Sequence, residues 1–359
     1  MLRTVRYSGT VTFSMVGADQ EVRVKVDFTL QGTAGEWDAA VAAEGEGYDG
    51  VWLSEIKHDP FPALAVAATR TERVELGTAI ALAFARNPMS LAVLANDLQL
   101  YSEGRFILGV GSQIKPHITK RFGMPWSAPA DRMREYLLAM RAIWKNWETG
   151  ESLRFVGEHY THTLMTPFFN PGPNPHGNPP ILLAGVGPRM TAVAGEVADG
   201  FFVHGFTTER YLRETTLPAL LAGRKAAGKE NLDGFEISGL PLIVTGDTDE
   251  QVATADAAVR KQIAFYGSTP AYRPVLEAHG WGELGEELNG LSKRGEWDEM
   301  GRRIDDDVLN AFAIVTPPNK VAAELLARYG DIFTRTGFYA PYPMPDGFWQ
   351  PILRDVQAG

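Results

Sequence analysis

Side chains and turns that could support chemistry follow several short apolar runs of this sequence. Glu55 and His58 follow the run 48–53, and a carboxylate beside an imidazole could bind a ring edge or move a proton. His58 could equally be a helix-entry residue bonded to backbone. The segments 109–113 and 185–189 are glycine-rich turns after other apolar runs. Such a turn before a helix leaves backbone N–H groups free for a phosphate, although glycine is also common in ordinary tight turns.

Other kinds of site are disfavoured by what the sequence lacks. The 359 residues include no cysteine, which excludes disulfides, thiolate catalysis and cysteine-held metals. His159 and His162 are three apart on an expected strand and would point to opposite faces, so we expect no metal site. Neither glycine turn is a dinucleotide fingerprint, because Ile114 and Met190 stand where the third glycine would be.

Charge narrows the range of partners. With 44 acidic and 34 basic residues the formal charge is −10, which argues against nucleic acid as a partner. No apolar run is long enough to span a membrane, and residues 1–20 lack the apolar core of a secretory signal, so we expect a cytoplasmic protein. A basic set on two neighbouring loops could receive an anionic ligand or could be ordinary solvated surface; its members are Lys57, Lys115, Lys120 and Arg121.

The elements that would position these residues alternate between strand and helix. The strands are too apolar for a sheet with one solvated face, which favours a parallel sheet covered on both sides. Eight expected strands with intervening helices favour a (β/α)8 barrel, in which chemistry is located where strands end. The expected strands span 22–30, 48–53, 73–82, 105–110, 180–184, 200–203, 235–245 and 332–339.

Two stretches break the repeat. Residues 148–178 are predicted to form a hairpin and loop, and residues 266–307 a short helical insertion. Both are expected to cover the barrel mouth and to set the substrate. The predicted organisation is an N-terminal extension (1–20), one barrel (21–345) with these two insertions, and a C-terminal tail (346–359).

An ordered set of motifs resembles the luciferase-like flavin and deazaflavin oxidoreductases. The motifs are Leu76-Gly77-Thr78-Ala79-Ile80, Arg86-Asn87-Pro88, the run 100–112, Ala184-Gly185-Val186-Gly187 and Ala198-Asp199-Gly200. Within that superfamily the chain is most similar to an actinobacterial subgroup of F420-dependent oxidoreductases, on the segments 48–52, 58–61 and 161–167. The resemblance covers about residues 24–342.

The resemblance implies a cofactor and a set of binding residues. It implies a (β/α)8 barrel with coenzyme F420, or alternatively FMN, across the mouth, and a cis peptide bond between Ala79 and Ile80. The oligoglutamate tail of F420 would suit the basic set. Glu55 and His58 are the candidate catalytic residues. The candidate cofactor-binding residues are Glu55, Ala79, Ile80, Gly111, Ser112, Gln113, Ala184, Gly185, Val186, Gly187 and Arg189.

Two departures from the family pattern limit these assignments. Related deazaflavin dehydrogenases carry adjacent Asp and His after this strand, whereas here Glu55 is followed by Ile56 and the imidazole is at His58. Ile114 stands where a sugar-phosphate dehydrogenase of the family has a catalytic Glu, so oxidation of glucose 6-phosphate is not expected.

The main hypothesis is therefore an F420-dependent oxidoreductase acting on a small organic substrate, and we expect a homodimer. The alternatives are an FMN-dependent monooxygenase and a non-catalytic flavin- or deazaflavin-binding protein.

Overall fold

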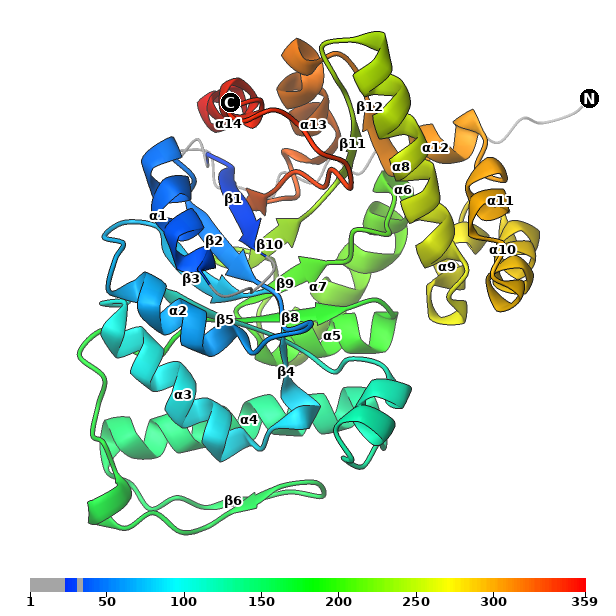
Figure 1. The fold of residues 1–359 in the computed structure, drawn as a ribbon. Coiled ribbons are helices and arrows are strands. Elements are labelled where there is room, and N and C mark those ends of the chain that lie inside the picture. The colour runs from blue at the N-terminus through cyan, green and yellow to red at the C-terminus, as the bar shows by residue number, and fades with distance from the viewer. Residues whose placement is uncertain (1–22, 31–34) are drawn as a thin grey trace, which may run out of the picture.

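The computed structural model describes residues 23–30 and 35–359, so the predicted N-terminal extension, 1–20, lies outside the described residues. Eight parallel strand positions close into a barrel, because the first and last positions of the sheet are joined through pairing of β3 with β5 (Figure 1). The (β/α)8 prediction is confirmed. The barrel strands are β1 (Lys25–Leu30), β2 (Gly50–Leu53), β3 (Glu75–Thr78) with β4 (Ala81–Leu82), β5 (Phe106–Gly111), β8 (Ile181–Gly185), β9 (Gly200–Val203), β10 (Glu236–Gly239) and β13 (Arg335–Thr336).

Helices surround the barrel. Two of them begin at polar caps followed by proline, since the side chains of Asp59 and Asn87 accept hydrogen bonds from the N–H groups of Phe61 and Ser90. The outer helices are α1 (Glu36–Glu46), α2 (Pro60–Ala68), α3 (Pro88–Tyr101), α4 (Pro129–Thr149), α5 (Pro188–Val197), α6 (Glu209–Tyr211), α7 (Leu217–Ala226), α13 (Val321–Tyr329) and α14 (Trp349–Ala358). The predicted tail thus contains a helix, α14, which buries Ile352, Leu353 and Val356.

Two predicted strands are each divided in the structure. Residues 73–82 form β3 and β4, which are separated by the predicted cis peptide bond between Ala79 and Ile80. Residues 235–245 form β10 and β11 (Leu242–Val244), with Pro241 between them. Because proline lacks an N–H group, the ladder is interrupted there, and β11 pairs with β12 (Ala313–Val315) instead of with the barrel.

A buried ion network fills the barrel where its strands begin. The guanidinium of Arg335, with no exposed side-chain surface, lies 2.8 Å from a carboxylate oxygen of Asp27 and 2.7 Å from one of Glu75. Glu236 lies 3.3 Å from the same group, and Lys25 is 2.8 Å from Glu75. Burial alone would raise the pKa of Glu75, but Arg335 and Lys25 lower it.

Aromatic rings lie next to this network inside the barrel. The Arg335 guanidinium carbon is 5.0 Å from the Trp52 ring centroid, and Trp52 meets Phe202 edge-on at 5.0 Å. Small residues make room for the rings: a Cβ on Gly77 would overlap Trp52, and one on Gly109 would overlap Phe202 as well as the Thr78 carbonyl oxygen. Trp52 and Phe202 therefore separate the ion network from the mouth.

The second insertion forms a helical wall with a core of its own. The wall consists of α8 (Asp249–Gly267), most of which precedes the predicted insertion, and of the helices from the insertion onward, α9 (Arg273–Glu277), α10 (Gly282–Arg294), α11 (Trp297–Arg302) and α12 (Asp306–Phe312). These helices share a hydrophobic cluster with Phe206 and with β11, apart from the main barrel core. Because Phe206 follows β9, this wall lies at the mouth, as predicted (Figure 1).

The first insertion is a hairpin, as predicted, but it does not cover the mouth. Its strands are β6 (Phe155–Val156) and β7 (Thr161–His162). The hairpin follows the C-terminal end of α4, which lies on the side where the barrel strands begin (Figure 1). Only its turn returns toward the mouth, where Glu135 of α4 accepts hydrogen bonds from the N–H groups of Glu158 (3.0 Å) and His159 (2.7 Å). The expected mouth position was wrong because an insertion between a helix and the next strand starts at the opposite end of the barrel.

Candidate active site

The carboxyl ends of the barrel strands bring most of the predicted site residues to one end of the molecule. The loops after β2, β4, β5, β8 and β9 all begin there (Figure 1). This is the end at which barrel enzymes carry their chemistry.

The carboxylate of Glu55 is engaged within the protein. One of its oxygens accepts hydrogen bonds from the N–H of Leu82 (2.8 Å) and from Arg86 (2.6 Å), and the side chain is only 7% exposed. Arg86 also donates to Asp59 (2.7 Å). Burial by itself would lower the pKa of Arg86, but the two carboxylates raise it. Glu55 therefore links the loop after β2 to the segment after β4.

The same loop holds the bend between β3 and β4. The Ser54 hydroxyl donates to the Ala79 carbonyl oxygen (2.7 Å), and the Glu55 N–H donates to the Ile80 carbonyl oxygen (3.3 Å). Ile80 in turn lies against Gly111, since a Cβ on that glycine would overlap the end of the Ile80 side chain. Ala79, Ile80 and Gly111 are thus brought together, as the predicted site requires.

Ser112 and Gln113 form a sharp turn after β5. Gln113 has a positive φ of 58°, and its side-chain oxygen accepts from the N–H of Ile114 (2.9 Å). The Ser112 hydroxyl donates to the Gln113 carbonyl oxygen (3.1 Å). The backbone N–H groups of Ser112 and Gln113 donate to no oxygen in the described part of the chain, so they are free for a ligand.

The turn from β8 into α5 has the geometry of an anion seat. Gly187 precedes α5 with no side-chain cap, and the space beside its α-carbon is open. Among the described residues, the N–H groups of Val186, Gly187 and Met190 have no hydrogen-bond acceptor. Free N–H groups at a helix start favour an anion. Arg189 is 80% exposed and lies 3.2 Å from Asp131, so its charge is directed partly away from the turn.

His58 does not join Glu55. Its side chain is exposed and forms no hydrogen bond with any described residue. Of the two predicted catalytic residues, one is bound to an arginine and the other faces solvent.

A second imidazole, His204 after β9, is enclosed by the helical wall. Its ring centroid is 4.6 Å from that of Tyr272 and 4.9 Å from that of Tyr266, and its Nδ1 accepts from the Phe206 N–H (3.0 Å). Burial lowers the pKa of His204 to about 4, so the ring stays neutral near pH 7. With Nδ1 accepting, the proton is on Nε2. The Tyr266 hydroxyl is 2.8 Å from that of Tyr339.

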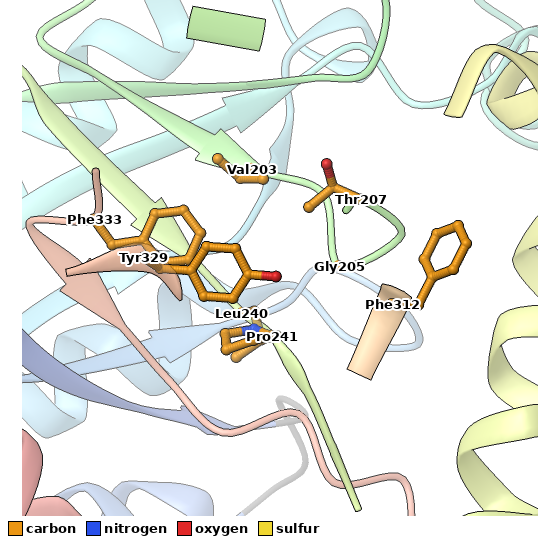
Figure 2. Close-up of a pocket in the computed structure, with 8 residues that line it drawn as sticks. All are labelled: Val203, Gly205, Thr207, Leu240, Pro241, Phe312, Tyr329 and Phe333. Carbon is orange, nitrogen blue, oxygen red and sulfur yellow. The ribbon is translucent and has the colours of Figure 1, made fainter. Parts of the chain in front are cut away.

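A small cavity lies beside this cluster, between the end of β9 and the wall. Figure 2 shows it bounded by Gly205 and Thr207 on one side and by Tyr329 and Phe333 on another. The Thr207 hydroxyl is buried without a hydrogen-bond partner. The cavity has room for about one water molecule, so it is not a cofactor site.

Sequence reasoning identified Glu55 and the two glycine turns, but its candidate residues did not include His204, Arg86, Ser54 or the tyrosines. Arg86 stands in a motif that was recognised, but the two acids it binds, Glu55 and Asp59, are distant in sequence, so no local signal predicted the contact. Within residues 23–30 and 35–359, no three His, Asp or Glu side chains are arranged to hold a metal. No helix of that part is long and apolar enough to cross a membrane.

Comparison with known proteins places this geometry in a family. The model of the luciferase-like monooxygenase family matches residues 12–335. An uncharacterised protein of Mycobacterium tuberculosis (strain ATCC 25618 / H37Rv) is 52% identical over 314 residues, 87% of this chain and 92% of that protein. An F420-dependent glucose-6-phosphate dehydrogenase of Nakamurella multipartita is 32% identical over 231 residues, 61% of this chain and 66% of that protein. The structure of a coenzyme F420-dependent tetrahydromethanopterin reductase from Methanopyrus kandleri superposes with a TM-score of 0.73 at 20% identity, covering 93% of this chain and 97% of that one.

Proposed function

Because the chain belongs to the luciferase-like monooxygenase family, we propose that it is an oxidoreductase that binds coenzyme F420 at the barrel mouth and acts on a small organic substrate. Bound there, the deazaflavin would exchange a hydride with the substrate at its C5 carbon. F420-dependent enzymes among its relatives support this cofactor.

The observation that carries the proposal is an anion-binding turn at Gly187 next to an apolar surface formed by Ile80 and Gly111. The free N–H groups at the start of α5, around Gly187, suit the cofactor phosphate. Ile80 and Gly111 provide an apolar surface for a planar ring, and the N–H groups of Ser112 and Gln113 can meet polar atoms at its edge. These groups lie on neighbouring strands, β4, β5 and β8.

Roles for the ionisable groups follow from their contacts. The Glu55 carboxylate is occupied by hydrogen bonds from Arg86 and the Leu82 N–H, so its role is to position the segment that carries Ile80. His204 remains neutral and offers its Nε2–H as a hydrogen-bond donor to a substrate oxygen. The helical wall that carries Tyr266 and Tyr272 would shape the substrate site.

The test is titration of the purified protein with F420 and, separately, with FMN. We expect F420 to bind in the micromolar range and FMN more weakly. Tight FMN binding with oxygen-dependent product formation would instead support an FMN monooxygenase. Binding of F420 with no redox turnover across a substrate screen would support the non-catalytic alternative.

A glycine variant tests the anion seat itself. Gly187→Ala places a methyl group in open space at φ −90°, so folding should be unaffected. The methyl group would obstruct an anion approaching the backbone, and F420 affinity should fall about tenfold, equivalent to roughly 1.4 kcal/mol. Gly45→Ala, also in open space but on the outer helix α1, is the matched control. Unchanged affinity in Gly187→Ala would reject this seat.

A further inference from the structure

Four aromatic residues with hydrogen-bonding side chains gather where the barrel meets the helical wall. His204 and Tyr339 follow the barrel strands β9 and β13, whereas Tyr266 and Tyr272 come from the wall. A Cβ on Gly205 would lie 3.0 Å from the Tyr339 ring, so this ring packs directly on the chain beside His204. These four residues are called the aromatic cluster below.

The aromatic cluster lies next to the turn that is proposed to hold the cofactor phosphate. In the parallel register of β8 and β9, Gly185 pairs with Val203, and His204 is the next residue after this pair. Gly187, at the anion-binding turn, follows Gly185 by two residues. His204 and the turn therefore stand at a similar level on neighbouring strands.

Two hydrogen-bond donors of the aromatic cluster have no acceptor in the described part of the chain. The first is the Nε2–H of His204, since Nδ1 accepts from the Phe206 N–H. The second comes from the hydroxyls of Tyr266 and Tyr339, which lie 2.8 Å apart and, among the described residues, bond only each other. One hydrogen bond uses one of the two O–H groups, so the other is free for a ligand. The four side chains are each partly exposed, which gives a ligand access.

The aromatic cluster contains no charged group. Burial lowers the pKa of His204 to about 4. Burial and the neighbouring Tyr266 raise the pKa of Tyr272 and that of Tyr339. None of these three shifts involves a charged side chain of the described residues, and Arg273, beside Tyr272 in sequence, has a carboxylate partner at 3.2 Å. The cluster therefore offers an anionic ligand no counter-charge near pH 7.

We propose that the aromatic cluster binds the carbonyl oxygen of an uncharged ketone or aldehyde substrate and disfavours phosphorylated and carboxylated compounds. A carbonyl oxygen accepts two hydrogen bonds, and the cluster has two free donors, one from His204 and one from the tyrosine pair. A negative charge enclosed among neutral rings would lose hydration without gaining a cation, which is costly. This assignment rests on the proposed function and adds a substrate class to it.

The test compares three fluorinated probes of similar size by fluorine NMR titration of the F420-loaded protein near pH 7. The ketone para-fluoroacetophenone has the carbonyl oxygen, para-fluoro-ethylbenzene lacks it, and para-fluorobenzoate carries a negative charge. We expect the ketone to bind about tenfold more tightly than either of the other two probes, because it alone is an uncharged acceptor for both donors.

A double variant removes the tyrosine donor and keeps both rings. Tyr266→Phe with Tyr339→Phe deletes two hydroxyls that bond each other, and removing both partners of a hydrogen bond is close to neutral for folding. Binding of the ketone should fall about three- to tenfold, the usual effect of one lost hydrogen bond. The affinity for F420 and the binding of para-fluoro-ethylbenzene should not change.

The matched control removes two tyrosine hydroxyls at the other end of the barrel. Tyr48 precedes β2 and Tyr101 ends α3, both on the side where the barrel strands begin. Tyr48→Phe with Tyr101→Phe should leave binding of F420 and of all three probes unaltered. An equal loss of ketone binding in the two double variants would overturn the role of the aromatic cluster.

The remaining outcomes separate this assignment from the proposed function. Equal binding of the ketone and its oxygen-free analogue would overturn the donor site, and a preference for para-fluorobenzoate would overturn the uncharged substrate class. If F420 binds and no probe does, the aromatic cluster is not a carbonyl site, while the proposed function stands. If F420 itself does not bind, the proposed function fails, and the assignment of the aromatic cluster with it.

Discussion

Replacing Arg335 with Met should reduce stability by about 3–5 kcal/mol, the typical cost of removing one partner of a buried ion pair. The Arg335 side chain has no exposed surface and Asp27 is 3% exposed, so the remaining carboxylates would be left charged inside the barrel. Of the cations in the described part of the chain, Lys25 alone would remain beside Glu75 and Glu236. This loss is a large fraction of the roughly 5–15 kcal/mol by which a typical domain is stable.

Urea unfolding followed by tryptophan fluorescence would measure this loss, since Trp52 lies beside the guanidinium. Without Arg335, burial would raise the pKa of Glu75, so protonation of this carboxylate at lower pH should restore part of the variant's lost stability. Its deficit relative to the native protein should therefore be smaller at pH 5 than at pH 8. Arg302→Met is the control, because Arg302 is 70% exposed and, among the described residues, pairs only with Glu299 of its own helix. It should cost less than about 0.5 kcal/mol.

A loss below about 1 kcal/mol in Arg335→Met would refute this reasoning, as would a deficit independent of pH. A further variant keeps the test informative if Arg335→Met does not fold. Combining it with Asp27→Asn removes one of the stranded charges, so the double variant should be more stable than the single one.

Two other substitutions test the interior of the barrel and its mouth. Gly109→Ala should destabilise the fold by several kcal/mol or prevent folding, because its methyl group would overlap the Thr78 carbonyl oxygen, a backbone atom that cannot easily move. Thermal unfolding, compared with that of Gly45→Ala, would measure the loss. Equal stability of the two variants would contradict the packing described. The pKa of His204 is about 4 when folded and 6.5 in its ordinary range, so the unfolded chain binds the proton more readily and stability falls as pH drops from about 6.5 toward 4. His204→Gln should lose about 2 kcal/mol less than the native protein between pH 7 and pH 5 in urea unfolding, and an identical pH dependence would show that the imidazole is not enclosed.

The barrel was predictable because its elements are locally encoded. The helices at 88–101 and 188–197 begin at proline after a capping position, and the strands are short apolar runs between turn residues. The end of the strand at 73–82 was harder, because a bend supported by Ser54 depends on a hydrogen bond from another strand. Pro241 was a local signal for the break after β10, but the apolar residues on both sides of it favoured one continuous strand over 235–245.

The site was predictable by position and much less by chemistry. A residue that follows a barrel strand lies at the mouth, which is why Glu55 and Gly187 were found. Arg86, 31 positions away on another loop, binds Glu55. This is a tertiary contact, and hydrophobic periodicity in the sequence does not predict it. The enclosure of His204 by Tyr266 and Tyr272 depends on how a helical insertion folds back. The homodimer expected from the sequence stays a prediction.

The separate core of the helical wall has a consequence for how such proteins diversify. The wall packs on Phe206, Leu242 and its own helices, and its buried residues form a cluster apart from that of the barrel. A substitution that reshapes the wall therefore leaves most barrel packing undisturbed, since energetic coupling is strongest between residues in contact. If the proposed function holds, natural variation can change the substrate through the wall while the proposed cofactor site in the barrel is kept. In a laboratory, libraries confined to 266–312 should retain far more folded members than libraries of equal size placed in the barrel strands.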